Sequence, residues 1–461
     1  MKQQRRLAAI VGMIAAAGWG ADALAQAANR NDPVPETPNQ NLTAIERTFA
    51  SVRVAEPLML FPQIREQLKD TPAFLRDSKA AINIRSYYRD NVTNASTGAG
   101  WNEAWATGGS VAFETGRLFN LISGGFVLYT SFPTYAPYEH DGTGLLKPGQ
   151  QQYGVLGQLY GKVHITDNHE IIAGRYLYDT PFIGPHDNRM TPKTFYGYVI
   201  HGTFGDEASG GPALRYGGGY IAAMKERNST EFISMSRSAG AGEDRGTGVL
   251  GGMFSWGPLR IGAIDYFTQD TMNIFYTEGK VGRDFGDISG ALAAQFAAES
   301  STGMNLLNGG TYWATNQFGV QGQLGYGGGI LTAAYTTVNP GFNMQTPWNA
   351  NPFYTDAQIL AFNRAGESAI LAGASYVFTR WGLPGVGASV QYFRGWTEAP
   401  AAGAPVLEDE WNFNLEYRPN WEFMKGLWLR ARYGIANTNQ NNVNTRIDEV
   451  RLILNYGIKL Y

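Results

Sequence analysis

The chain has 461 residues, a formal net charge of -3 and a mildly negative mean hydropathy of -0.25. It contains no cysteine, which excludes disulfides. The near-neutral charge gives no indication of nucleic acid or of another strongly charged bulk partner.

The first 25 residues have the composition of a secretory signal peptide. Lys2, Arg5 and Arg6 precede the apolar run Leu7 to Trp19, and Ala23-Leu24-Ala25 is a small-x-small cleavage signal. We therefore expect residues 1–25 to be removed and the mature chain to leave the cytoplasm. No later run approaches the roughly 18–20 apolar residues that a membrane-spanning helix needs.

Residues 26–80 differ from the rest of the chain. Asn29 to Asn41 is polar and contains prolines, which favours disorder. Leu42 to Lys69 can form short amphipathic helices broken at Pro57 and Pro62. We interpret residues 26–80 as a periplasmic or plug-like leader, with an oligomer contact or a flexible leader as open alternatives.

From Ala81 to the end, strand-like tracts alternate with breaks rich in glycine, proline, asparagine and aspartate. In Gln158 to Thr166, Leu159, Val163 and Ile165 lie opposite polar residues, because successive side chains of a strand point to opposite faces. Other examples of predicted strands before the last fifty residues are Ile82 to Arg89, Gly109 to Gly116, Phe126 to Thr130, His169 to Tyr176, Phe195 to Thr203, Leu214 to Lys225, Leu292 to Glu299, Gln317 to Tyr326, Ile330 to Val338, Ile370 to Phe378 and Ala388 to Phe393.

The last fifty residues contain three strictly alternating tracts, Trp411 to Arg418, Leu427 to Ile435 and Val450 to Leu460. One face of each tract is apolar or aromatic, and the other carries arginine, asparagine or glutamate. An apolar face toward lipid and a polar face toward a wet lumen are typical of a transmembrane β-barrel.

The length of the chain sets the size of this barrel. At roughly 10 residues per strand plus turns and loops, the residues from Ala81 onward predict roughly 16–18 strands. The longest breaks are Ser131 to Gln152, Asp179 to Pro192, Asn339 to Asn363 and Thr397 to Asp409. We expect Ser131 to Gln152 to fold into the lumen as a constriction loop.

Four stretches, taken in order, are informative: Arg85 to Asp90; Gly142 to Leu146; Pro181 through Arg189 with Pro192, Phe195 and Gly197; and Lys425 to Tyr433 followed by Asp448 to Ile453. They resemble the OprD-type substrate-specific porins of Gram-negative outer membranes, and the resemblance covers Ala81 to Tyr461. The first is similar to the family's first barrel strand, the second to its constriction-loop segment, the third to a motif that enters the following strand, and the fourth to its closing strands.

The resemblance implies an all-β fold, a transmembrane antiparallel β-barrel of about 18 strands with long extracellular loops. It implies a channel for small carboxylate-bearing nutrients, namely amino acids and aromatic or other organic acids, with arginines on one lumen wall and an acidic patch opposite. The expected partners are such anions, outer membrane lipid and lipopolysaccharide. Monomer and trimer both stay open, and no cofactor is expected.

A ladder of lumen arginines is also expected from the barrel itself, because the two ends of the chain meet when it closes. Arg85, Arg430, Arg432 and Arg451 have lumen parity, and Lys162 and Arg418 are weaker members of the same set. Guanidinium groups can replace the hydration that a carboxylate loses in a narrow pore. The alternative is that these arginines balance lumen carboxylates or lie at the headgroup interface.

The loops supply the candidate constriction residues: Tyr135, Tyr138, Glu139, Asp141, Lys147, Asp187 and Arg189. Asp187 and Arg189 could form an eyelet pair or a loop ion pair worth little.

Catalytic and metal sites are not expected. His140-Asp141 and His186-Asp187 are adjacent pairs without a nucleophile motif, and no zinc or calcium spacing is present. The remaining alternatives to a substrate-specific channel are a general non-selective diffusion pore and a structural outer membrane barrel.

Overall fold

The computed structural model describes residues 57–206, 210–397, 406–419, 421–441 and 443–461. The predicted signal peptide and most of the predicted leader, up to residue 56, lie outside the described residues. None of the helices within the described ranges is long and apolar enough to cross a bilayer.

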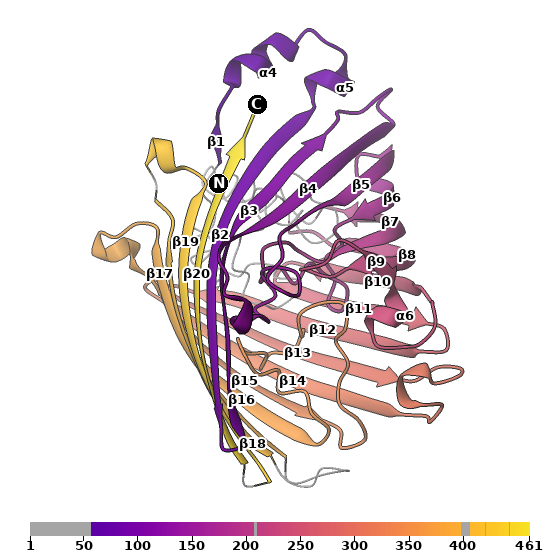
Figure 1. Ribbon diagram of the computed structural model, residues 1–461. Helices are drawn as coiled ribbons and strands as arrows, with labels where there is room; N and C mark the ends of the chain where they lie inside the picture. The colour runs from indigo at the N-terminus through magenta and orange to yellow at the C-terminus, as the bar shows by residue number, and fades with distance from the viewer. Residues whose placement is uncertain (1–56, 207–209, 398–405, 420, 442) are drawn as a thin grey trace.

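Apart from the short β1 (Leu58–Met59) and β9 (Phe232–Ser234), 18 strands form one closed antiparallel barrel (Figure 1). Each pairs with the next in the chain, β8 pairs with β10, and β20 (Val443–Lys459) closes the ring on β2 (Lys79–Ala95). The others are β3 (Gly98–Glu114), β4 (Ile122–Tyr135), β5 (Tyr153–Thr166), β6 (His169–Tyr176), β7 (Thr194–Gly205), β8 (Ala213–Lys225), β10 (Thr247–Trp256), β11 (Leu259–Thr268), β12 (Met272–Phe285), β13 (Ile288–Ser300), β14 (Ala314–Tyr326), β15 (Gly329–Val338), β16 (Glu367–Val377), β17 (Val386–Thr397), β18 (Val406–Tyr417) and β19 (Leu427–Gln440).

The two faces of the strands differ as the alternation predicted. On β19, Trp428, Arg432 and Ala436 are buried inside the ring, whereas Tyr433 points outward. Large apolar side chains such as Leu250 and Leu292 are exposed on the outside. Closure pairs the backbone groups of every strand, which is the condition for strands in lipid. The predicted transmembrane antiparallel barrel is confirmed.

The strands are longer than the tracts that exemplified them in the sequence. β10, β11 and β12, which cover 247–285 with short turns, lie between those examples. Gly251-Gly252 interrupts the apolar alternation in β10. β4 extends to Tyr135, so the loop expected from Ser131 begins five residues later. The loop predicted from Thr397 to Asp409 lies mostly outside the described residues, and β18 already begins at Val406.

The described end of the predicted leader, residues 57–78, lies at the barrel end where the chain terminates (Figure 1). The helix α4 (Pro62–Leu68) begins with Pro62, a residue suited to a first helical turn, and is followed by α5 (Ala73–Arg76). β1 pairs in parallel with β20, beside the start of β19. The leader is thus joined to the barrel by backbone hydrogen bonds.

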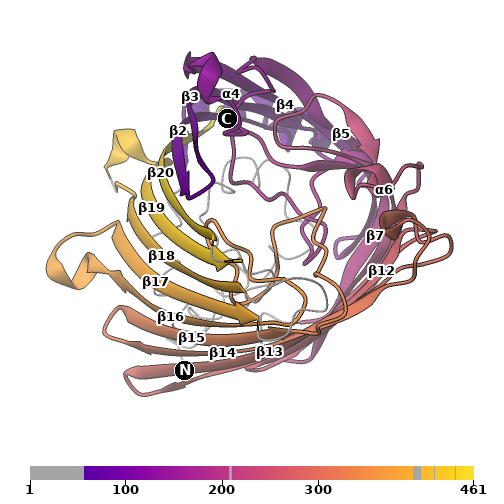
Figure 2. The same ribbon diagram turned by 60° about the horizontal axis from the view of Figure 1, so that its bottom comes forward.

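Several loops turn into the barrel rather than away from it, and Figure 2 shows them inside the ring of strands. Three matter for the lumen: the β4–β5 loop (136–152), the β6–β7 loop (177–193) and the β15–β16 loop (339–366). They include the short 3-10 segment η2 (Tyr138–His140) and fully buried side chains such as Phe182 and Trp348. These three loops therefore narrow the lumen that the strands enclose.

The backbone of β3 makes one barrel position intolerant of a side chain. Gly109 has φ +139°, and a Cβ there would lie 1.8 Å from the carbonyl oxygen of Asn83 on β2. Gly109→Val should therefore destabilise the barrel by at least about 1–3 kcal/mol. The measurement is the temperature at which the folded band converts to the unfolded band in heat-modifiable gel mobility. Gly161→Ala on β5, where a Cβ meets nothing within 4 Å, is the matched control and should melt like the wild type.

Candidate functional site

The inner side of β19, β20 and β2 carries a wall of arginines. Arg432 lies directly opposite Arg451, and Arg451 lies directly opposite Arg89, so three guanidinium groups stand in one row across adjacent strands. Arg430 lies one row away, opposite Ile453, and Arg85 one row further, opposite Asn455. Rows are two residues apart, or about 7 Å along a strand. The structure thus brings Arg85, Arg430, Arg432 and Arg451 together on one wall.

Arg89 belongs to this wall and was missed in the sequence. Its Nε donates to Glu449 Oε2 at 2.8 Å, and it also donates to the Thr143 carbonyl oxygen at 2.6 Å. Arg451 binds the other oxygen of Glu449 at 2.5 Å. Arg89 shares the parity of Arg85 four residues later, and this signal could have identified it. Glu449 therefore holds two arginines of the row in fixed positions.

The β6–β7 loop is bound to the wall through Asp187. Both oxygens of Asp187 accept hydrogen bonds from Arg85, at 2.6 and 2.8 Å, and Arg85 also donates to the carbonyl oxygen of Arg189 at 2.5 Å. Bidentate guanidinium–carboxylate pairs are strong and geometrically specific. Asp187 pairs with Arg85, whereas Arg189 donates to the carbonyl oxygen of Asn188 at 2.8 Å.

Arg189 and Arg227 bring two more cations to the row from loops. Burial, together with the charges of Arg89, Arg227 and Arg451, lowers the pKa of Arg189 well below its usual value. Burial also lowers the pKa of Arg227, in spite of the opposing charge of Glu226. Asn188 accepts a hydrogen bond from Arg227 and so fixes it beside the β6–β7 loop. Arg227 follows β8 in a segment without periodicity, so no sequence pattern pointed to it.

The β4–β5 loop packs inside the barrel through its middle. Leu145 and Leu146 are buried against Tyr87 and against Ala104 and Ala106 of β3. Ser131 donates to the Leu145 carbonyl oxygen at 2.8 Å. The predicted insertion of this loop agrees with these contacts, which place Thr143 beside Arg89.

The residues of this loop that were expected to constrict the lumen lie elsewhere. Tyr135 ends β4 opposite Trp105, on the outer face, and is 52% exposed; Tyr138 is 78% exposed. Glu139 is exposed as well. Asp141 accepts backbone hydrogen bonds from Gly142 and Gly149 and closes the loop on itself, and Lys147 pairs with Gln151 through the backbone. The sequence prediction ended β4 before Ser131, so Tyr135, which lies on the outer face of β4, was expected in the loop.

The β15–β16 loop also lies in the lumen, and wall carboxylates hold it there. Glu410 accepts from the backbone of Ile359 and Leu360 at 2.9 and 2.7 Å, and Glu299 accepts from the backbone of Gln345 at 2.7 Å. A further contact reaches the arginine row. Gln358 donates to Glu449 at 3.1 Å, and its carbonyl oxygen accepts from Arg451 at 2.9 Å.

Lys162 and Arg418 lie at the two sides of the arginine wall. Lys162 on β5 is buried and pairs with Glu114 at 3.4 Å, three strands away from Arg89. Arg418 follows β18, and its guanidinium lies 5.0 Å from the ring centre of Trp428, with Arg430 at 5.8 Å from the same ring. Arg418 therefore extends the wall, whereas Lys162 belongs to a separate polar cluster.

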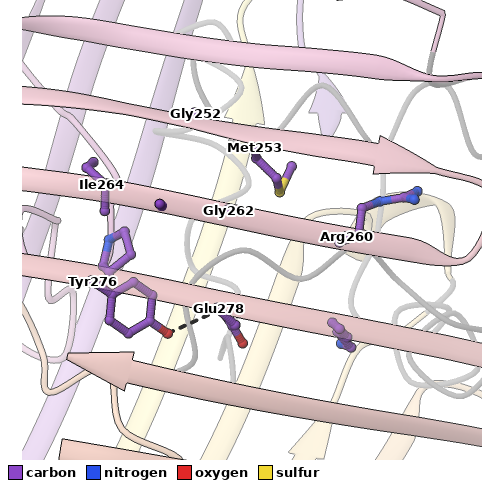
Figure 3. A pocket seen from close by; sticks show the side chains of 10 residues that line it. Gly252, Met253, Arg260, Gly262, Ile264, Tyr276 and Glu278 are labelled. Carbon is purple, nitrogen blue, oxygen red and sulfur yellow. Dashed lines mark hydrogen bonds between the residues drawn. The ribbon is translucent and has the colours of Figure 1, made fainter.

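The wall opposite the arginines contains a pocket of mixed character (Figure 3). β11 is the strand halfway round the ring from β20. Arg260 and Lys280 lie directly opposite each other on β11 and β12, and Tyr276 donates to Glu278 at 3.2 Å. In the described residues, no group of three or more histidine or acidic side chains could hold a metal ion.

Comparison with known proteins agrees with this architecture. Three crystal structures from Pseudomonas aeruginosa match the whole of their own chains: OccK9 (OpdG), at 23% identity over 84% of this chain with a TM-score of 0.76; OpdK with vanillate, at 20% over 84% with 0.73; and OccK2 (OpdF) in complex with glucuronate, at 19% over 85% with 0.71. No curated protein sequence matches the chain.

The sequence profile for outer membrane porins of the OprD family matches residues 72–460. That range includes every strand of the closed barrel and the three loops inside it. The chain belongs to the OprD family of outer membrane porins.

Proposed function

We propose that this porin admits small carboxylate-bearing nutrients, such as aromatic or other organic acids and amino acids, by passive diffusion, and that the arginine wall relays them. The observation that carries the proposal is the row of Arg89, Arg451 and Arg432, which Arg189 and Arg227 approach from loops. Glu449 pairs with both Arg89 and Arg451, and Glu226 pairs with Arg227.

A carboxylate that enters this region loses part of its hydration. Guanidinium groups replace the lost hydrogen bonds with charged, bidentate ones. Because Arg85, Arg430 and the row lie at successive heights, an anion can form contacts with one level before it leaves the previous one. Several weak sites in sequence permit passage, whereas one deep site would trap the anion.

Two structures of similar fold were determined with vanillate and with glucuronate. Both ligands are small carboxylates, which favours the same chemical class of permeant for this chain. The apolar and aromatic side chains of the inserted loops suit a permeant with an apolar body.

The first experiment is single-channel recording of the purified protein in a planar bilayer, with benzoate or glutamate added under constant salt. We expect conductance that a carboxylate blocks in a concentration-dependent manner. Conductance without block would instead indicate a general diffusion pore, and a silent but folded barrel would contradict channel function.

Removing two cations from the wall should weaken the carboxylate block. The double substitution Arg430→Ala and Arg432→Ala is expected to raise the blocking concentration by about tenfold or more, because each charged hydrogen bond contributes about 1.5–3 kcal/mol. Folding should be unchanged, since lumen substitutions alter selectivity more than stability.

The matched control is Arg260→Ala with Lys280→Ala, which removes the same charge from the opposite wall. It should change the block much less than the first pair. Equal effects of the two pairs would mean that net lumen charge, not the arginine wall, determines affinity.

The pairing of Asp187 with Arg85 should control the aperture. Asp187→Asn removes the charge that holds the β6–β7 loop against β2, so we expect a larger and noisier single-channel current. Asp167→Asn, which removes an exposed pairing with Arg117, should leave the current as in the wild type. An unchanged current in the Asp187 variant would show that other contacts suffice to hold the loop.

A further inference from the structure

Four polar side chains form a chain of contacts on the inner face of β4 to β7, away from the arginine wall. Ser123 Oγ lies 2.8 Å from His164 Nε2, and His164 Nδ1 lies 3.1 Å from Glu170 Oε2. The other oxygen of Glu170 lies 3.0 Å from His201 Nε2. His164, Glu170 and His201 are directly opposite one another in the sheet, so strand register sets these contacts.

The cluster is shielded by the barrel and faces its lumen. Ser123 is 5% exposed, and the side chains of His164 and Glu170 are 9% and 15% exposed. Their neighbours along the strands, Ile122 and Ile171, are exposed on the outer face. Alternation therefore points the polar set toward the inside of the barrel.

The two nitrogens of His164 have different partners. Glu170, as a carboxylate, can only accept at Nδ1, so Nδ1 carries the proton of the neutral ring. Nε2 then presents its lone pair to the Ser123 hydroxyl. A hydroxyl on a histidine that is oriented by a carboxylate is the arrangement of an activated serine nucleophile.

We propose that Ser123, His164 and Glu170 form a hydrolytic triad that cleaves small carboxylic esters inside the lumen. Ser123 is the nucleophile and His164 the general base and acid. Glu170 is a positioning residue beside the ring, and His201 Nε2 lies 3.0 Å from its other oxygen. This role is separate from relay by the arginine wall and does not depend on it.

The reaction balances with water as the only co-reactant. Ser123 Oγ bonds to the ester carbonyl carbon while its proton passes to His164 Nε2. The bond to the alcohol oxygen breaks, and the alcohol leaves with that proton. Water then attacks the acyl-serine and gives a proton to His164, which returns it to Ser123 Oγ as the carboxylate and one proton are released. Lys162, directly opposite Ser123, is placed to balance the charge of the tetrahedral oxygen.

Other charged groups face this cluster and contribute to its pH dependence. They are Lys162 with Glu114 on the neighbouring strands, Arg117 with Asp167 at the barrel end, and Arg215 on β8 beside the strand of His201. Since His164 must be neutral to accept the proton, the reaction should become faster as pH rises and this imidazole loses its proton.

The test uses the purified full chain in detergent, a fluorophosphonate probe and p-nitrophenyl acetate. We expect the probe to label Ser123, as located by mass spectrometry of the digested protein, at a rate that rises with pH. Ser123→Ala should abolish labelling and lower ester hydrolysis to the level without protein. His164→Gln should slow labelling by about 100-fold or more.

Two variants of Glu170 and one control variant distinguish a role in positioning His164 from an effect on folding. Glu170→Gln should slow labelling and alter its pH profile, and Glu170→Asp should recover part of the rate. Ser110→Ala removes another buried serine on the adjacent strand β3 and should label like the wild type. Heat-modifiable gel mobility confirms that each variant is folded. Absence of labelling at Ser123 in the folded wild type, or equal hydrolysis by the Ser123→Ala variant, would overturn the proposal.

Discussion

The pairing of β2 with β20 is the contact on which the rest of this structure depends. In lipid, an open strand edge would leave N–H and C=O groups without partners, so a sheet must close on itself. Closure also joins the two ends of the chain. Arg85 and Arg89 near the start therefore stand beside Arg451 near the end, and the arginine wall exists because the barrel closes there.

Some lumen carboxylates bind arginines and others bind the backbone of an inserted loop, and the sequence pattern did not distinguish these two roles. Glu449 fixes the arginines of the row, whereas Glu410 and Glu299 accept backbone hydrogen bonds from the β15–β16 loop. A loop inside a barrel leaves N–H groups that water and sheet partners no longer satisfy. Carboxylates on the wall supply these acceptors, so acidic residues in the lumen serve as loop anchors as well as charges.

The sequence predicted the barrel and much of its wall because lipid and lumen impose opposite chemistry on alternate residues. Arg430, Arg432 and Arg451 stand in tracts where this alternation is strict. The contrast is weaker in β10, where glycines occur on both faces.

The loops were less predictable because long-range partners, not local period, determine their path. Trp348 donates to the Met235 carbonyl oxygen, more than a hundred positions away, and Arg227 donates to Asn188 of the β6–β7 loop. The Ser123 cluster was missed for the same reason: its members come from four strands, and the register joins them.

The inserted loops are tied to one another as well as to the wall. Lys193 in the β6–β7 loop donates to the Pro347 carbonyl oxygen of the β15–β16 loop at 2.7 Å and pairs with Glu226 at 3.2 Å. A substitution in one loop therefore shifts residues contributed by another. A new substrate preference in this channel would therefore evolve through coordinated substitutions in several loops. The outward-facing strand residues are less constrained, because they need only remain apolar.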